Sequence, residues 1–212
     1  RMQCGESLKL FNGDGCEYEA TIAGVDKKSV QVTIAAASAI ERESPLTIHL
    51  GIAISKGERM DWVIQKATEL GVTHITPLLT ERVEVRLQGE REEKKLQHWR
   101  SIAISACEQC ARNRLPGIDT PIALATWLDS IAADAKFVLH HRSAVALDSR
   151  ADKPRSVALL IGPEGGLSET EIASAEKKGF APLRLGPRIM RTETAPVAAL
   201  SIFQFLWGDL RG

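Results

Sequence analysis

Two loops rich in glycine and proline carry the residues whose types and spacing could do chemistry. The first, at 162–166, reads Gly-Pro-Glu-Gly-Gly and follows an apolar run at 158–161 that predicts a buried strand. The second begins with Gly-Pro at 186–187, after a short strand expected over 182–185. Such loops expose main-chain amides and carbonyls to close approach by a ligand. Ligands bind where neighbouring strands of an open parallel sheet end.

An arginine and a carboxylate follow the second loop. Arg191 and Glu193 precede an apolar helix expected to open near Pro196. The arginine could stabilise negative charge on a substrate oxygen, and the carboxylate could accept a proton. A buried ion pair that closes the loop explains the same two residues, so both interpretations stay open. Glu164, in the first loop, could bond a ligand ribose or only cap its own loop.

A third strand end, after Leu139, brings His140 to the same edge, although a histidine there could also merely close a loop. Bare main chain at three strand ends suits a flat purine, with Leu139, Leu185, Ile189 and Met190 as apolar faces. The alternative is that the glycines only form tight turns. The chain has no dinucleotide fingerprint, Walker loop or serine nucleophile elbow, which argues against those enzyme classes.

Strands and helices alternate from residue 45 onward, which predicts a parallel sheet with covering helices. Ser168 and Glu171 have the spacing of a capping box, so a helix should start there and stop near Gly179. The other elements are expected as strands over 46–54, 75–79 and 136–139 and helices over 58–70, 90–113 and 126–133.

Residues 1–44 follow a different pattern. Apolar and polar residues alternate over 18–25 and 29–34, with a charged turn between them, which predicts a β-hairpin. We therefore expect a small β domain over 1–44 and an α/β domain over 45–212. The abrupt start of the chain predicts that an N-terminal piece is missing.

Composition indicates a globular protein without a bulk signal for nucleic acid. The 212 residues are 44% hydrophobic and 25% charged, and the formal net charge is zero, so any RNA contact must come from a local basic patch. No apolar run is long enough to span a membrane and no secretory leader is seen. Cys107 and Cys110 could be a redox pair or half a zinc site. We favour two small helix residues in a reducing cytoplasm, and no metal site, because no second ligand pair is visible.

Four arginines flank the long helix at 90–113 and are candidate RNA contacts. Arg112 and Arg114 lie at its end, with no acid after Glu108, where a phosphate could bind. Arg82 and Arg86 precede its start.

Four stretches together resemble the SPOUT class of S-adenosylmethionine-dependent RNA methyltransferases. Within that class the chain is similar to the bacterial family that methylates N3 of a uridine in 16S ribosomal RNA. The stretches are IGPEGGLSETE at 161–171, LGPRIMRTETAPVAAL at 185–200, QKATELGV at 65–72 and EQCARNRLP at 108–116.

The resemblance implies a mostly parallel sheet whose C-terminal part threads through a loop as a trefoil knot, preceded by a small PUA-like β-barrel that is truncated here. It implies a homodimer that acts on 16S ribosomal RNA or the small ribosomal subunit. Arg191 and Glu193 would be catalytic, and the PUA-like domain would help to grip RNA. S-adenosylmethionine (SAM) would be held by Leu139, His140, Gly162, Pro163, Glu164, Gly165, Gly166, Leu185, Gly186, Ile189, Met190 and Arg191.

Two other functions remain open. The chain could be a non-catalytic RNA-binding or ribosome-assembly module whose glycine loops are structural. It could also bind a different adenine ligand in the same loops.

Overall fold

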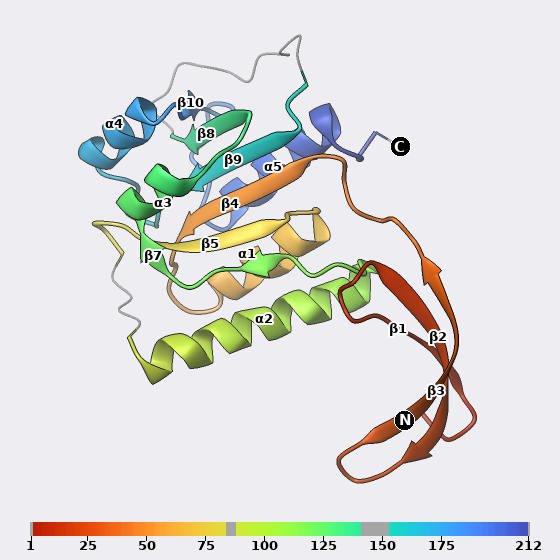
Figure 1. Cartoon of the computed structure of the whole chain (residues 1–212). Helices are drawn as coiled ribbons and strands as arrows, with labels where there is room; N and C mark the ends of the chain where they lie inside the picture. Colours follow the sequence, from red (N-terminus) through yellow and green to blue (C-terminus); the bar gives the residue numbers. More distant parts are fainter. Residues whose placement is uncertain (1, 84–87, 141–152, 212) are drawn as a thin grey trace. The chain divides into compact units, whose positions relative to one another are not determined.

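The structure of the protein is a computed structural model that describes residues 2–83, 88–140 and 153–211 (Figure 1). The chain divides into two compact units. One consists of Arg1–Glu43 with Cys107–Leu115, and the other of Ser44–Ala106 with Pro116–Gly212. Near the predicted boundary, the division falls between Glu43 and Ser44. The segment Cys107–Leu115 differs, because it groups with the N-terminal unit and not with the α/β unit.

The smaller unit contains a three-stranded antiparallel sheet in the order β1-β2-β3. Its strands are β1 (Ser7–Leu10), β2 (Cys16–Val25) and β3 (Val30–Ala39). The predicted hairpin is confirmed: β2 pairs with β3, and the amide of Asp26 donates to the carbonyl of Ser29 at 2.9 Å in the turn.

A short segment after a helix completes this unit. Helix α2 (Glu90–Cys110) ends three residues before the predicted position because Ala111 adopts a left-handed conformation, with φ of 63°. The following Asn113 is buried, and its Nδ2 donates to the carbonyls of Gly15 at 3.1 Å and Ile40 at 2.7 Å. These bonds explain why the segment belongs with the β-strands.

The larger unit is built on a sheet in which every strand pair is parallel, as the alternating pattern predicts. The strand order is β10-β8-β9-β4-β5-β6, and β7 also pairs with β5. The two-residue strands β6 and β7 were not predicted because they are too short to carry a hydrophobic pattern. The strands are β4 (Thr47–Ala53), β5 (His74–Leu79), β6 (Gly117–Ile118), β7 (Ile122–Ala123), β8 (Ala135–Leu139), β9 (Ser156–Ile161) and β10 (Ala181–Leu183).

Helices cover both faces of this sheet, and each face has its own core (Figure 1). One core joins the strands to α1, α2 and α5, with Met60, Trp99 and Phe203 fully buried. The other joins them to α3 through Trp127 and to α4 through Ala175, and Phe180, which follows α4, also belongs to it. The remaining helices are α1 (Arg59–Glu69), α3 (Leu124–Ser130), α4 (Glu169–Lys177) and α5 (Thr194–Trp207).

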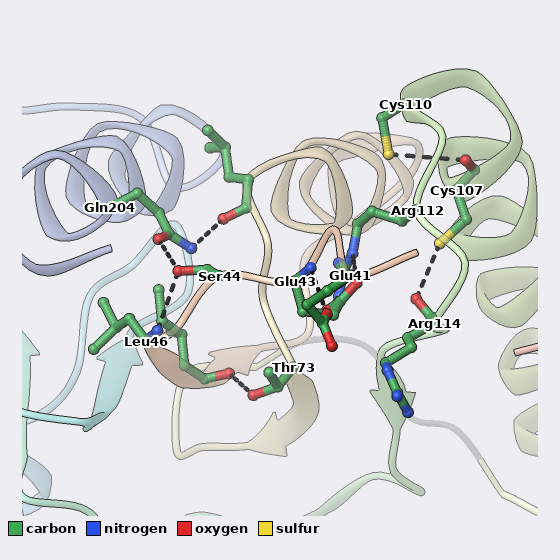
Figure 2. A network of polar contacts seen from close by, with 12 residues as sticks. Glu41, Glu43, Ser44, Leu46, Thr73, Cys107, Cys110, Arg112, Arg114 and Gln204 are labelled. Atoms are coloured by element: carbon green, nitrogen blue, oxygen red, sulfur yellow. Dashed lines mark hydrogen bonds and ion pairs between the residues drawn. The ribbon is translucent and has the colours of Figure 1, made fainter. Parts of the chain in front are cut away.

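Two polar devices fix helix positions. The predicted capping box starts α4, since the hydroxyl of Ser168 accepts from the amide of Glu171 and the Glu171 carboxylate accepts from the amide of Ser168. Within α5, the buried Gln204 accepts from the Ser44 hydroxyl at 2.6 Å and donates to the carbonyl of Leu70 at 2.8 Å (Figure 2). No helix in the described part of the chain is long and apolar enough to cross a membrane.

Candidate active site

The end of β8 and the loops after β9 and β10 meet at one edge of the sheet and line a cavity of about 320 Å³. Strand β8 lies between β10 and β9, and all three are parallel, so their carboxyl ends are adjacent. Leu139 and His140 at the end of β8, together with the loops after β9 and β10, supply most of the lining. It includes every residue that the resemblance assigns to SAM except Arg191, and in addition Arg82, Ile161, Leu167, Glu169, Ile172, Leu183, Arg184, Pro187, Arg188, Thr192 and Ala195.

The fold of the first loop, at 162–166, itself requires glycine at two positions. A Cβ on Gly162 would lie 2.9 Å from Cγ and 3.0 Å from the amide nitrogen of Leu167. Gly166 has φ of 70°, and its amide donates to the carbonyl of Pro163 at 2.8 Å. The two interpretations of these glycines are therefore compatible, because the same residues form a tight turn and face the cavity.

Arg82 braces this loop from the segment after β5. Its Nη1 donates to the carbonyl of Gly165 at 2.7 Å and lies 3.5 Å from that of Leu167. The preceding amide, of Glu81, donates to the carboxylate of Glu171 at 2.8 Å. Arg82 was predicted as an RNA contact. Its geometry adds a role toward the glycine loop that no local sequence pattern indicates, and the RNA contact stays a prediction.

Arg59, the first residue of α1, lies beside carboxylates from both glycine-proline loops. Its Nη1 is 2.6 Å from Oε1 of Glu164, and its Nε is 3.9 Å from Oε2 of Glu193. Partial burial raises the pKa of Glu164, but hydrogen bonds from its own backbone, from Arg59 and from the Lys56 amide outweigh this and lower the pKa below the ordinary value. Sequence reasoning missed Arg59 because it is distant in sequence from both partners.

The predicted catalytic residues flank the cavity wall without being part of it. Met190 and Thr192 line the cavity, whereas Arg191 and Glu193 do not. The Arg191 side chain is exposed, and its carbonyl accepts from the amides of Thr194 and Ala195 at the start of α5. The Glu193 side chain is 20% exposed. The catalytic roles of both residues stay predictions.

His140 lines the cavity from the end of β8, and its amide donates to the carbonyl of Leu183 at 3.0 Å. Gly186 has φ of 74°, in keeping with the tight turn expected after β10. No group of three or more His, Cys, Asp or Glu residues in the described ranges could hold a metal ion.

Arg112 and Arg114, the predicted RNA contacts near the end of α2, differ from each other in burial. The Arg112 side chain is 6% exposed and bonds the carboxylate of Glu43 through Nε at 3.0 Å and through Nη2 (Figure 2). A phosphate contact by Arg112 would require this pair to open, whereas Arg114 is exposed. Arg86 lies outside the described residues. The RNA roles of all three stay predictions.

The two cysteines of the C-x-x-C pattern lie on the last turn of α2, as expected for small helix residues. Cys107 is buried, and its thiol donates to the carbonyl of Arg114 at 3.6 Å (Figure 2). Burial raises the pKa of Cys107 to about 11 despite the nearby Arg112. A thiol with this pKa is inert at neutral pH.

The geometry can be compared with that of known proteins. A model of the RNA methyltransferase domain matches residues 42–204, and a model of the RNA methyltransferase PUA domain matches residues 1–35. The chain belongs to this RNA methyltransferase family. Among family members, it is 39% identical to ribosomal RNA small subunit methyltransferase E of Buchnera aphidicola (Schizaphis graminum), over 99% of this chain and 86% of that protein. The Bacillus subtilis protein of the same name is 31% identical, over 100% of this chain and 86% of that protein.

Two solved structures of relatives contain the methyl donor. A Legionella pneumophila protein with bound SAM is 48% identical, has a TM-score of 0.95 and is matched over 98% of this chain and 86% of that chain. Ribosomal RNA small subunit methyltransferase E from Neisseria gonorrhoeae, bound to SAM, is 38% identical and has a TM-score of 0.90. The match covers 98% of this chain and 86% of that chain. These relatives share the mostly parallel α/β sheet, and the N-terminal unit matches the PUA family model.

Proposed function

We propose that the chain binds SAM in the cavity at the ends of β8, β9 and β10 and methylates N3 of a uridine in 16S ribosomal RNA of the small subunit. The observation that carries the proposal is the cavity itself, with bare main chain from three neighbouring strand ends, in a family whose close relatives bind SAM. Its volume of about 320 Å³ lies at the lower end of the range of small-molecule sites. The family and the names of the relatives favour catalysis over a non-catalytic module.

The cavity residues fit an adenosyl ligand in chemical type. Main-chain amides and carbonyls in the two loops can bond the edge of a purine, and Leu139, Leu185 and Met190 can cover its faces. We assign Glu164, which lines the cavity, to accept hydrogen bonds from the ribose hydroxyls. When bound, SAM supplies a methyl group that is already activated on its sulfonium.

The remaining chemistry falls to this chain. Uracil N3 must lose its imide proton as the new N–CH₃ bond forms and the S–CH₃ bond breaks, so the methyl transfer leaves a neutral thioether and one proton. We assign that proton to Glu193, directly or through water. We assign Arg191 to stabilise the negative charge that develops on uracil O2 or O4. The exposed side chain of Arg191 and its place between the lining residues Met190 and Thr192 support this assignment.

The finer features of the fold belong to the same proposal. The C-terminal part would thread through a loop to form a trefoil knot, and the N-terminal unit would be a truncated PUA-like barrel that grips RNA, with Arg114 and Arg82 as candidate contacts. The substrate would place the reaction in the cytoplasm.

We also propose a homodimer in which α5 contributes to the interface. Phe205 of α5 is 53% exposed, so its ring is available to pack against a second chain, and Arg211 lies over the ring at 4.9 Å. Analytical ultracentrifugation is expected to show a dimer that Phe205→Asp weakens. A monomeric parent protein would contradict this part of the proposal.

Calorimetry and a methylation assay test the function. Titration of SAM into the protein should give a heat signal that fits a single site per chain. Mass spectrometry of nucleosides should show N3-methyluridine in 16S RNA or small subunits that have been incubated with the protein and SAM. Arg191→Ala should keep the melting temperature and lose methyl transfer. Absence of SAM binding would leave the non-catalytic module as the better interpretation, and binding of adenosine but not SAM would indicate another adenine ligand.

A further inference from the structure

Arg59 occupies a position that its own helix does not explain. It is the first residue of α1, where the helix dipole disfavours a positive charge. Its side chain is 44% exposed, so it does not fill the core. What distinguishes the position is the pair of carboxylates around the guanidinium, Glu164 at 2.6 Å and Glu193 at 3.9 Å.

The two carboxylates come from segments on different sides of the cavity. Glu164 belongs to the loop between β9 and α4 and lines the cavity directly. Glu193 follows the loop after β10, and its neighbours Thr192 and Ala195 line the cavity. One planar guanidinium that presents Nη1 to the first loop and Nε to the second can fix both, because its donors are held in a rigid fork.

The turn that precedes α1 contributes a second contact to the Glu164 carboxylate. The amide of Lys56 donates to Oε1 of Glu164 at 3.4 Å, the atom that also accepts from Arg59. The turn after β4 and the first residue of α1 thus hold the first loop through the same carboxylate oxygen. Both acids lie within 3.9 Å of Arg59, so removing the cation would leave two like charges near each other without the cation between them.

We propose that Arg59 is a positioning residue that holds the two glycine-proline loops in their ligand-ready arrangement through Glu164 and Glu193. The inference rests on the proposed function for the identity of the ligand, but not for the ordering of the loops. Arg59 does not line the cavity itself. It acts through Glu164 on the ligand and through Glu193 on the segment that carries Arg191.

Hydrogen–deuterium exchange of the ligand-free protein tests the ordering without SAM. In Arg59→Gln, peptides that span 162–168 and 186–193 should exchange faster than in the parent, while peptides from α2 exchange at the parent rate. Arg42→Gln is the matched control, because it removes another arginine–glutamate pair, with Glu17 at 2.6 Å, in the N-terminal unit. Parent exchange rates in both loops of Arg59→Gln would overturn the inference.

Calorimetry with SAM tests the consequence for the ligand. Arg59→Gln should weaken SAM binding about tenfold, the loss that corresponds to one charge-assisted hydrogen bond. Glu164→Gln should weaken it as well, and the loss in the double variant should be smaller than the product of the two single losses, because both single variants remove the Arg59–Glu164 contact. Arg59→Lys should recover part of the affinity, and Arg42→Gln should bind as the parent does.

The outcomes separate the two proposals. A parent protein that binds no SAM would refute the proposed function, while the exchange experiment would still decide whether Arg59 orders the loops. A parent that binds SAM together with an Arg59→Gln variant of equal affinity would refute only the role of Arg59. Effects of Arg59→Gln and Glu164→Gln that multiply in the double variant would refute the route from Arg59 through Glu164 to the ligand.

Discussion

The most informative perturbation in the N-terminal unit is Arg112→Leu. Sequence reasoning places Arg112 at a helix end as a phosphate contact, whereas the structure gives it a buried ion pair. Its side chain is 6% exposed and that of Glu43 is 16% exposed. Leucine removes the cation and leaves the Glu43 carboxylate largely buried without this partner. Breaking a buried pair in this way costs about 3–5 kcal/mol of unfolding free energy.

The double variant Arg112→Leu/Glu43→Leu supplies the matched control. Replacing both members of a buried ion pair by apolar residues is often nearly neutral, so the double variant should recover most of the stability that the single variant loses. Glu43→Leu alone should also destabilise, because it leaves the guanidinium buried without the carboxylate.

The assay has to report on the N-terminal unit, because a chain with two compact units need not unfold in one step. Hydrogen–deuterium exchange in urea, followed in peptides from β2 and β3, gives the local free energy of opening. We expect this free energy to fall in Arg112→Leu while peptides from β4 and β9 keep theirs. A loss below about 1 kcal/mol, the range of surface pairs, with a clear loss of RNA affinity, would show that Arg112 is an RNA contact and that the buried pair is dispensable.

Two further predictions concern the α/β unit. Gly162→Ala should destabilise the protein by about 1–3 kcal/mol through overpacking, because its Cβ would lie 3.0 Å from the Leu167 amide nitrogen. It should also abolish SAM binding. Thermal melting tests the first effect and calorimetry tests the second. Gly165→Ala, whose Cβ meets only a flexible arginine side chain at 3.4 Å, should be milder. Burial, with a smaller contribution from His74, lowers the pKa of His49 from 6.5 to about 4. The folded state therefore binds fewer protons than the unfolded state, so stability should fall as the pH drops through 6.5 and level off below about 4, with a loss of about 2 kcal/mol by pH 5. Urea unfolding at pH 7 and pH 5 should show this loss in the parent and less of it in His49→Gln; equal losses would contradict the assignment.

The features predicted correctly from the sequence are encoded by neighbouring residues. The Ser168–Glu171 capping box spans one helical turn and needs no information from elsewhere. The strand 158–161 and the loop after it follow from a short apolar run and the glycines that end it. Even the left-handed Gly179 after α4 follows from its position beyond the last helical residues.

The features that were missed depend on partners far apart in the chain. Arg59 and Glu164 are separated by 105 positions, and Arg112 and Glu43 by 69. A single sequence shows that an arginine is present but not which carboxylate it meets. The sequence therefore predicts a phosphate contact for Arg112, from its place at a helix end with no acid after Glu108, and gives no sign of its pair with Glu43. The three-residue error at the end of α2 has a local cause, the left-handed Ala111, but alanine gives no warning of it.

The contact between Arg59 and Glu193 changes how the two proposed catalytic residues divide their work. The sequence suggested that Arg191 and Glu193 form a couple, in which each would hold the other. In the structure the ion pair recorded for Glu193 is with Arg59, at 3.9 Å, and the Arg191 side chain is exposed. A carboxylate held by α1 can keep its place while the arginine two residues earlier turns toward a substrate. Glu193, the proposed proton acceptor, is then fixed by the protein, whereas Arg191 is free to turn toward the charge that develops on the substrate. The two roles can therefore be separated by mutation. Glu193→Gln and Arg191→Ala should then have independent effects on methyl transfer, whereas a mutual pair would make them strongly non-additive.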